Sequence, residues 1–333
     1  MRLATYNVEW MNSLFADDGA LLNGMEWSGR HDVTRRDQIA ALCTVFRAMD
    51  ADAVMIIEAP DQGRNRDTVA ALEVFADYAG IRARRAIMGF ANDTQQEIAL
   101  LFDPNVMTVS HEPQVHDGAP QFDGSFAIDL DIDATEDTVV FSKPPLELAV
   151  ETVGGAKFRM IGAHLKSKAP HGAKTRDEVL RISIANRRKQ LAQAIWLRTR
   201  IAANLEEGTS LVLLGDLNDG PGLDEYEHLF GRSSVEIIMG TGETALFDPH
   251  ARQGLQRRLG AMPTTARFWI RPEQRYLQAL LDYIMVSPDL ARRDGRWRIW
   301  HPLDDPECWG QPDLRDALVT ASDHFPVSLD IAL

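Results

Sequence analysis

The sequence predicts a mixed α/β protein whose strands are joined by both helices and hairpins. Short apolar runs, such as Ala53–Glu58 and Leu211–Asn218, have the length and flanking residues of buried strands. Stretches with helical spacing of apolar residues, such as 36–49, separate them. Gly154 and Gly155 lie between two further strand-like runs and predict a hairpin. The 333 residues allow one large or two ordinary domains, and no repeat or long linker divides them.

In the first third of the chain, strands and helices alternate. The predicted strands are 2–8, 53–58 and 97–102, the last stopped by Asp103-Pro104. The predicted helices are 36–49, with Ile39, Leu42, Cys43, Phe46 and Met49 at helical spacing, and 67–78. Between the first strand and the first helix lies the polar segment 12–34, in which apolar residues follow neither helical nor strand spacing.

The remainder continues the pattern. Predicted strands are 139–153 and 157–166, which form the hairpin, then 211–216, 280–286 and 322–329. A long amphipathic helix over 177–205 directs Leu180, Ile184, Leu191, Ile195 and Ile201 towards the core. Its charge run Arg187, Arg188 and Lys189 is interpreted as the solvent face. The segment 240–280, rich in arginine and interrupted by proline, is interpreted as a long loop region.

The segment Leu211–Asn218, LVLLGDLN, carries the strongest chemical signal. Four apolar residues predict a buried strand, and Gly215 allows a sharp turn at its end. Asp216 and Asn218 are two residues apart, so an extended backbone places both side chains on one face. A carboxylate and an amide together suggest metal-assisted attack on a phosphate ester. Taken alone, the segment is better explained as an ordinary Asp/Asn turn after a strand.

Polar residues end or begin five other strands in the same way. Asn7, Glu58 and His164 end strands, whereas Asp282 and the pair Asp323-His324 begin them. If the last two strands run antiparallel to the others, all these side chains meet at one edge of a sheet. Each has an ordinary alternative: a strand terminator, a core histidine or a capping residue. Six such coincidences are a poorer explanation than one shared site.

These motifs, in this order, resemble the endonuclease/exonuclease/phosphatase superfamily. That group includes deoxyribonuclease-I-like nucleases, abasic-site endonucleases, neutral sphingomyelinases and inositol-polyphosphate phosphatases. The resemblance rests on Asn7, Glu58, His164, GDLND at 215–219, LDYIMVS at 281–287 and SDHFPV at 322–327. It implies a four-layer sandwich of two packed mixed β-sheets flanked by helices, in one domain over 1–333.

The resemblance also implies a metal site. Hydrolysis of a phosphodiester requires neutralised charge, an activated water and a stabilised leaving oxygen. Mg²⁺ suits these tasks with one or two carboxylates, and Mn²⁺ could substitute. Glu58 is the first expected ligand, with Asn7 beside it. Asp216, Asn218 and Asp323 are expected to complete or adjoin the metal and phosphate site.

Two histidines are expected to flank the metal, each oriented by a carboxylate that raises its pKa. By resemblance, His324 with Asp282 is the general base or a phosphate clamp. His164 with Glu97 is the general acid. Glu97 is the weaker assignment, because one glutamate before an apolar run is common.

His164 also bears on the branch of the family, because abasic-site endonucleases usually carry tyrosine there. HLKSK at 164–168 and FSKPPLEL at 141–148 most resemble extracellular nucleases. Lys143 stands where relatives often have arginine, so charge is kept but the bidentate fork is lost. Lys143 and Lys166 are expected to bind the substrate phosphate. The alternative for Lys143, Lys166 and Lys168 is a solvated strand end.

Composition excludes several classes of protein. The chain is 45% hydrophobic and 25% charged, as in soluble globular proteins. It has neither a visible signal peptide nor an apolar run of membrane-spanning length, so a cytoplasmic enzyme without an obligate protein partner is expected. The net charge of −14 argues against tight, salt-driven binding to long duplexes. Cys43 is expected to be a buried thiol, and His31, His171 and His250 surface residues.

Three functions remain from the sequence. The first is a metal-dependent nuclease, based on His164, HLKSK and FSKPPL. The second is a phosphoesterase for a small or lipid phosphate, such as an inositol phosphate or a phospholipid headgroup, based on the acidic surface. A phospholipid would favour an apolar lip, which Trp269, Trp297, Trp300 and Trp309 could form if they are not buried. A non-catalytic binding module is disfavoured by the complete set of acids and histidines.

Overall fold

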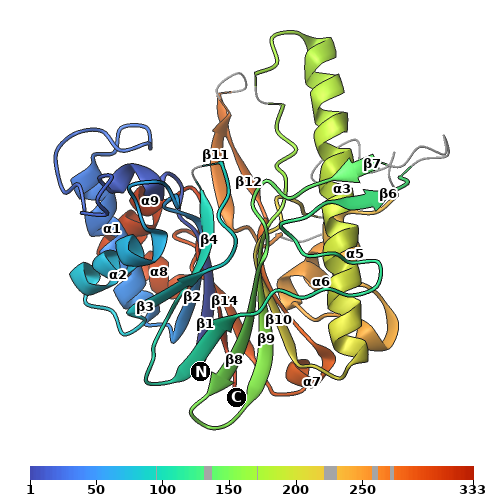
Figure 1. The fold of residues 1–333 in the computed structure, drawn as a ribbon. Coiled ribbons are helices and arrows are strands. Elements are labelled where there is room, and N and C mark those ends of the chain that lie inside the picture. Colours follow the sequence, from blue (N-terminus) through green and yellow to red (C-terminus); the bar gives the residue numbers. More distant parts are fainter. Residues whose placement is uncertain (95, 131–136, 171, 221–230, 257–261, 271–273) are drawn as a thin grey trace.

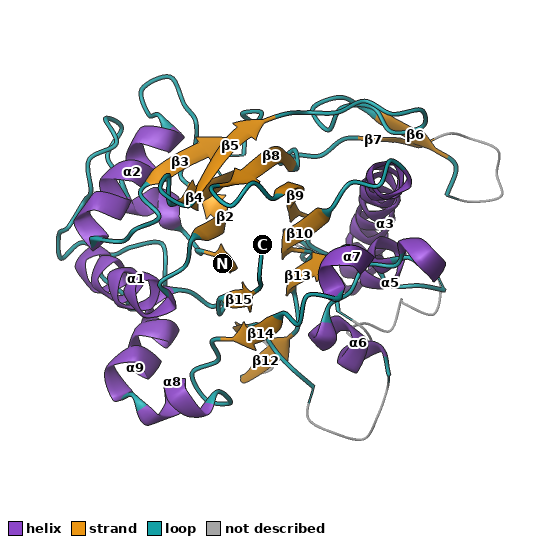
Figure 2. Cartoon of the chain, turned by 90° about the horizontal axis from the view of Figure 1, so that it is seen from below, coloured by secondary structure: helices purple, strands orange, loops and turns teal. Residues whose placement is uncertain are grey.

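A computed structural model describes residues 1–333 except 95, 131–136, 171, 221–230, 257–261 and 271–273. Two β-sheets pack face to face, and helices cover both outer faces (Figures 1 and 2). The four-layer sandwich implied by the resemblance is therefore confirmed. Among the described residues, no helix has the length and apolar character needed to cross a membrane.

The first sheet has six strands in the order β14-β15-β1-β2-β4-β3. β1 lies parallel to β2 and antiparallel to β15, and β4 lies antiparallel to β2. The strands span Arg2–Asn7 (β1), Ala53–Ala59 (β2), Arg85–Met88 (β3), Glu97–Phe102 (β4), Arg296–Ile299 (β14) and Val327–Asp330 (β15).

The second sheet repeats that arrangement in five strands, ordered β13-β10-β9-β8-β5. β10 lies parallel to β9 and antiparallel to β13. The strands span Met107–His111 (β5), Leu146–Thr152 (β8), Lys157–His164 (β9), Leu211–Asp216 (β10) and Asp282–Val286 (β13). Two further antiparallel pairs form two-stranded sheets: β6 (Phe126–Ile128) with β7 (Asp137–Val139), and β11 (Ala266–Ile270) with β12 (Arg275–Ala279).

Helices cover each sheet from outside (Figure 2). On the first sheet lie α1 (Arg35–Met49), α2 (Thr68–Ala79), α8 (Pro306–Gly310) and α9 (Pro312–Ala321). On the second lie α3 (Arg176–Glu206), α5 (Ser234–Met239), α6 (Pro249–Leu255) and α7 (Pro288–Ala291). The described residues also include two single 3₁₀ turns, η1 (Met11–Leu14) and η2 (Gly242–Thr244).

Apolar side chains fill the three spaces between these four layers. Along β10, Leu211 and Leu213 face the helices, whereas Val212 and Leu214 face the other sheet. Both faces are buried, which explains why the strand is apolar throughout rather than alternating. Between the sheets, a Cβ added to Gly162 would lie 2.4 Å from the Met55 sulfur. A larger residue at 162 would therefore displace the end of the Met55 side chain and press on Ile98 of the facing sheet.

Strand direction brings the predicted functional ends together. Asn7, Glu58, His164 and Asp216 lie at or near the carboxyl ends of β1, β2, β9 and β10. Because β13 and β15 run antiparallel to these strands, Asp282 and the residues before β15 lie at the same edge. The predicted convergence of strand ends is confirmed.

Three predicted elements differ in the structure. The segment 240–280 contains α6 and the hairpin β11–β12, and so is not simply a loop. The strand expected over 139–153 is divided, because Pro144 and Pro145 cannot donate to a sheet, so β8 begins only at Leu146 and its residues 146–151 pair with β9. The first turns of α3 project beyond the sheets in Figure 1, so Leu180 is 43% exposed rather than in the core.

Several single-residue expectations can also be compared. Cys43 is a buried free thiol, as expected. His31 is exposed as expected, His250 is half-buried, which makes that prediction wrong, and His171 lies outside the described residues. Among the tryptophans, Trp300 is buried, whereas Trp269 and Trp309 are about half exposed.

A buried ion pair ties α3 to the second sheet. The Arg200 guanidinium pairs with Glu147 of β8, and both side chains are almost fully buried. Arg200 also donates to the carbonyl oxygens of Ala119 and Pro120 at 2.9 and 2.8 Å. Phe122 lies under the guanidinium, 4.7 Å from ring centre to carbon. Removing either charge would leave the other buried and uncompensated.

We predict that Arg200→Ala lowers the free energy of unfolding by about 3–5 kcal/mol, because Glu147 loses its counter-charge in the interior. Urea denaturation of both proteins measures the difference. Arg181→Ala, at an exposed position of the same helix, is the matched control and should change stability by less than about 0.5 kcal/mol. Equal effects of the two substitutions would contradict the buried-pair assignment.

Candidate active site

A cleft of about 720 Å³ opens at the edge where the strand ends converge. Acidic residues, lysines and apolar residues all line it. All the predicted site residues except Glu97 and Asp282 line it directly: Asn7, Glu58, Lys143, His164, Lys166, Asp216, Asn218, Asp323 and His324. Asp282 joins them through its contact with His324, described below.

Asn7 and Glu58 lie on neighbouring parallel strands of the first sheet. The Asn7 amide donates to Asp216 Oδ2 at 3.0 Å, while its buried Oδ1 has no hydrogen-bond partner. Glu58 adopts a left-handed φ of 63° where the β2–β4 register shifts between Ile57 and Ala59. Such a bulge redirects a side chain, here towards the cleft. Burial raises the pKa of the Glu58 carboxyl.

Asp216 occupies the centre of the site. Its Oδ1 accepts from the Asn218 backbone amide at 2.7 Å, and the Asn218 side-chain amide donates to the Leu165 carbonyl at 3.0 Å. Burial raises the Asp216 pKa to about 7. Gly215 has a φ of 136°, and a Cβ there would lie 2.0 Å from the Ala163 carbonyl oxygen. The glycine before the aspartate is thus required for β9 and β10 to pair at this edge.

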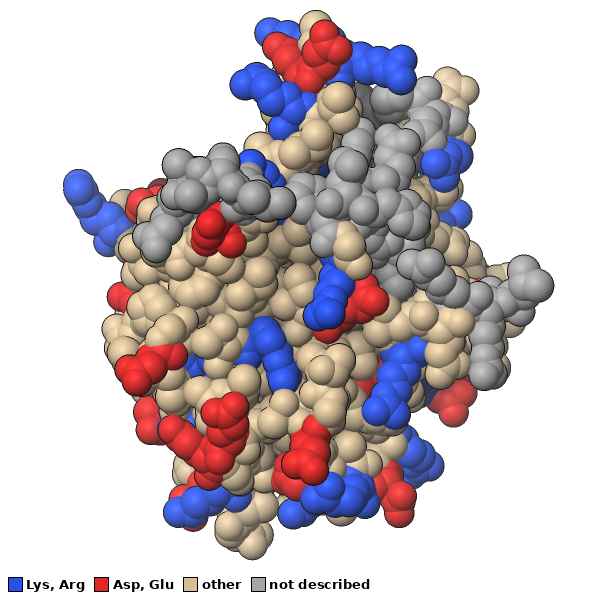
Figure 3. Space-filling model, turned by 90° about the vertical axis from the view of Figure 1, so that its right-hand side faces the viewer, with Lys and Arg blue, Asp and Glu red and all other residues tan. Residues whose placement is uncertain are grey.

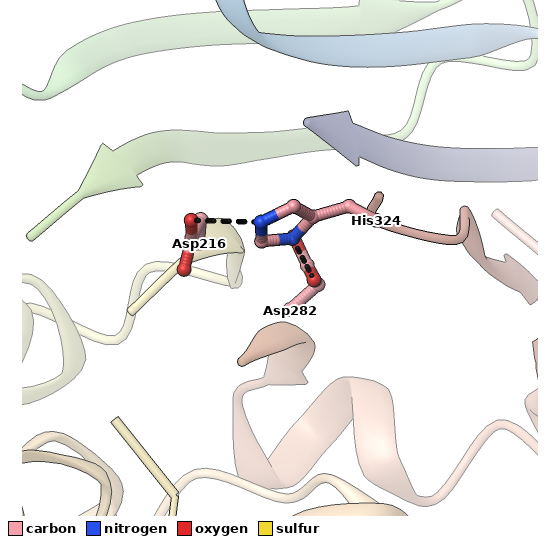
Figure 4. A group of neighbouring side chains, drawn as sticks. All are labelled: Asp216, Asp282 and His324. Atoms are coloured by element: carbon pink, nitrogen blue, oxygen red, sulfur yellow. Dashed lines mark hydrogen bonds and ion pairs between the residues drawn. The ribbon is translucent and has the colours of Figure 1, made fainter. Parts of the chain in front are cut away.

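His324 forms the predicted pair with Asp282 (Figure 4). Its Nδ1 lies 2.7 Å from Asp282 Oδ2, and its Nε2 faces Asp216 at 3.9 Å. Burial lowers the His324 pKa, but Asp282, Asp216 and Asp323 outweigh it and hold that pKa well above its ordinary value. The expectation that a carboxylate orients this histidine and raises its pKa is confirmed.

His164 approaches Asp216 from β9, with Nε2 at 3.7 Å from Oδ2. Glu97 is not the partner of His164 that the sequence predicts. Among the described residues, it accepts hydrogen bonds from the Asn92 side chain and the Gln62 backbone amide, and none joins it to His164. Lys143 instead lies 3.3 Å from His164 Nδ1. Burial, Lys143 and His324 lower the His164 pKa well below its ordinary value, which is opposite to the sequence-based expectation.

Asp323 lies beside Glu9 and His324, and burial raises its pKa to about 7. Its Oδ1 is buried without a partner. Glu9 lines the same cleft and pairs with Arg30. The sequence indicated Glu9 only by its position two residues after Asn7, which is too weak a signal to assign it to the site.

A buried network beneath the cleft holds the Asp216 turn. Asp219 accepts from Arg187 at 2.8 Å and from Lys168 at 2.7 Å, and Gln190 donates to the Asn218 carbonyl at 2.8 Å. Arg187 is therefore buried, and its assignment to a solvent-facing charge run was wrong. The helix crosses the end of β10 at this point, so one residue of the run faces inwards. Lys189 is exposed, as expected.

The donor set fits a divalent cation. Asn7, Asp282 and Asp323 each have a buried oxygen without a hydrogen-bond partner. Burial, with a smaller contribution from neighbouring acids, raises the pKa values of Glu58, Asp216 and Asp323, so a bound cation would stabilise their charged forms. Ligand atoms of Asp216, Asp282 and His324 lie within 4.8 Å of one another. In that trio, however, His324 Nδ1 is committed to Asp282, which leaves Nε2 and Asp216 for an ion.

Comparison with known proteins identifies the class. The model of the Endonuclease/Exonuclease/phosphatase family matches residues 4–324, so the chain belongs to this family. The protein is a phosphoesterase of that family, whose members typically depend on a divalent metal. No curated protein sequence matches the chain significantly.

Solved structures share the fold at low sequence identity. An AP endonuclease from Archaeoglobus fulgidus is 14% identical, with a TM-score of 0.52 and complete coverage of both chains. TDP2 from C. elegans is 13% identical, with a TM-score of 0.50, covering 98% of this chain and 74% of that one. At this identity the likeness defines architecture and leaves the substrate open.

We predict that Mg²⁺ or Mn²⁺ stabilises the protein, because a bound cation offsets the repulsion among the buried carboxylates. At a free metal concentration a hundredfold above Kd, the gain is about 2.7 kcal/mol. Urea denaturation with metal and with EDTA measures it. Glu58→Gln should abolish most of the gain, whereas Glu97→Gln should retain it. A gain unaffected by Glu58→Gln would place the ion elsewhere.

Proposed function

We propose that the protein is a Mg²⁺- or Mn²⁺-dependent phosphodiesterase, and that it is a nuclease acting on DNA or RNA. One observation carries the proposal: His164 and His324 both direct Nε2 at Oδ2 of Asp216, in the cleft that Glu58 and Asn7 also line. This arrangement matches the needs of in-line attack by water on a phosphodiester. The presence of histidine at 164 also supports the branch of extracellular nucleases and sphingomyelinases.

Glu58 and Asn7 would hold the cation, with Asp216 and Asp323 completing or adjoining its site. When bound, the cation would neutralise phosphate charge and stabilise the leaving oxygen. Asp216 is braced by Asn7 and by the Asn218 backbone amide, so its carboxylate has little freedom to turn away. Fixed orientation of this kind reduces reorganisation during the reaction.

His324 is the best candidate for the general base. With Nδ1 hydrogen-bonded to Asp282, a neutral ring presents a bare Nε2 to the cleft, where it can accept a proton from water. Its raised pKa favours the charged ring, which would clamp the phosphate, so His324 can act as a base only after this proton has left. Lys166 supplies positive charge at the cleft wall, and Asn218 is proposed to donate to the phosphate if its amide is released from Leu165.

The surface supports a small nucleic-acid footprint. Lysines line the cleft, but the face in Figure 3 mixes acidic and basic side chains without a continuous basic stripe. The net charge of −14 also disfavours tight, salt-driven binding to long duplexes. The nuclease reading therefore implies contact with few phosphates and weak dependence of binding on salt.

A second candidate is a phosphoesterase for a small or lipid phosphate. It is favoured by an apolar wall of the same cleft, formed by Phe268, Ile270, Leu277 and Leu281 around the β11–β12 hairpin. Trp269 and Tyr276 of that hairpin are each half exposed and contact each other. An apolar group attached to the phosphate could pack against this wall.

Parallel assays separate the candidates. Purified protein with Mg²⁺, Mn²⁺ or EDTA would be offered plasmid DNA, RNA, bis-p-nitrophenyl phosphate, a phosphomonoester and sphingomyelin. We expect metal-dependent cleavage of the diesters and of at least one nucleic acid. Cleavage of the monoester alone would refute the nuclease, and cleavage of sphingomyelin alone would establish the second candidate.

We predict that His324→Ala lowers kcat on the cleaved diester by about 10²–10⁴-fold, because the group that accepts the proton is lost. Steady-state kinetics measure kcat, and circular dichroism checks that the fold is retained. His31→Ala, at an exposed histidine, is the matched control and should leave kcat unchanged. Near-normal turnover in the His324 variant would remove this histidine from the mechanism.

A further inference from the structure

In the two histidines of the site, Nδ1 faces partners of opposite charge. His324 faces a carboxylate, Asp282, at 2.7 Å, whereas His164 faces the Lys143 ammonium at 3.3 Å. A carboxylate can only accept a hydrogen bond, and an ammonium can only donate one. The contact with Lys143 therefore requires a lone pair, and no hydrogen, on His164 Nδ1. A neutral His164 must then carry its hydrogen on Nε2, which faces the cleft.

Lys143 is held in this position by a second contact. Its Nζ donates to Gln96 Oε1, and Gln96 Nε2 donates to Glu58 Oε2 at 2.6 Å. The glutamate can only accept, so it fixes which end of the Gln96 amide faces Lys143. The side chains Glu58, Gln96, Lys143 and His164 form one directed chain of hydrogen bonds. Gln96 gave no sequence signal of its own, because it simply precedes Glu97.

Glu97 cannot take the place of Lys143. One of its oxygens accepts from the Asn92 side chain at 2.6 Å, and the other from the Gln62 amide at 3.2 Å. The carboxyl group is buried, with 1% of the residue exposed. It braces the loops around β4 and has no lone pair directed at His164 among these contacts.

We propose that Lys143 is a positioning residue that fixes His164 as the Nε2–H tautomer. His164 then donates a hydrogen bond to a phosphate oxygen, instead of supplying a proton as a general acid. The part of the proposal that concerns phosphate rests on the proposed function, whereas the tautomer is a property of the protein alone. Donor and acceptor roles are thereby divided between His164 and His324.

The tautomer can be measured directly. In the full-length protein labelled with ¹⁵N-histidine, with Mg²⁺ and no substrate, long-range ¹H–¹⁵N spectra distinguish protonated from bare ring nitrogens. Loss of one signal set in His164→Ala assigns the ring. We expect a protonated Nε2 and a bare Nδ1 in the wild type. Lys143→Met should lose this preference, and Lys143→Arg, which also offers only donors, should retain it.

Two further variants serve as matched controls. Lys166→Met removes an equal charge from the same cleft, and Glu97→Gln removes the carboxylate expected from the family pattern. Neither should change the His164 tautomer. A protonated Nδ1 in the wild type, an unchanged tautomer in Lys143→Met, or a change in Glu97→Gln would each overturn the proposal.

Kinetics add a readout that structural damage alone would not give. On the diester substrate, Lys143→Met should lower kcat by about 10- to 100-fold, with most of this loss recovered in Lys143→Arg. Equal losses in both variants would overturn the positioning role. If the protein cleaves no diester at all, the proposed function fails, but the spectra still decide the tautomer.

Discussion

The site depends on keeping a carboxylate, Asp216, almost fully buried at the meeting point of two sheets. Burial, opposed by His324 and by hydrogen bonds from Asn218 and Asn7, raises its pKa to about 7, so the surroundings decide whether it is charged. Asn7, the Asn218 amide and two imidazoles surround it, each from a different strand end. The remaining acids raise the cost of ionisation further, which is why a cation fits this arrangement.

The rest of the fold can be understood as support for that cluster. Parallel pairing of β1 with β2, and of β9 with β10, places the ends of adjacent strands side by side. The antiparallel strands β13 and β15 return their first residues to the same edge. Beneath the turn, Asp219 and Arg187 fix the loop from the side of α3. Rigid elements therefore carry most of the reactive groups, and loops supply the remainder.

The sequence predicts well which residues lie at the strand ends, but it predicts poorly which side chains form hydrogen bonds with one another. Asn7, Glu58, His164 and Asp216 could be assigned because apolar runs locate strands and the polar residue marks each end. The His324–Asp282 pair followed from family order. The sequence could not show which of Glu97, Lys143 and Gln96 contacts His164. That depends on the exact positions of side chains from separate segments of the chain. Arg187 failed for a similar reason: a charged run on a helix does not reveal which residue faces inwards.

The two sheets approach each other closely where Gly162 of β9 faces Met55 of β2, and this packing has a consequence for the active site. Asn7 and Glu58 belong to one sheet, while His164 and Asp216 belong to the other. The distance between these two pairs of side chains therefore depends on how far apart the sheets are packed. Met55 and the other buried side chains between the sheets set that distance. We expect that a larger side chain in this layer would push the two sheets apart and so lengthen the contact between Asn7 on one sheet and Asp216 on the other.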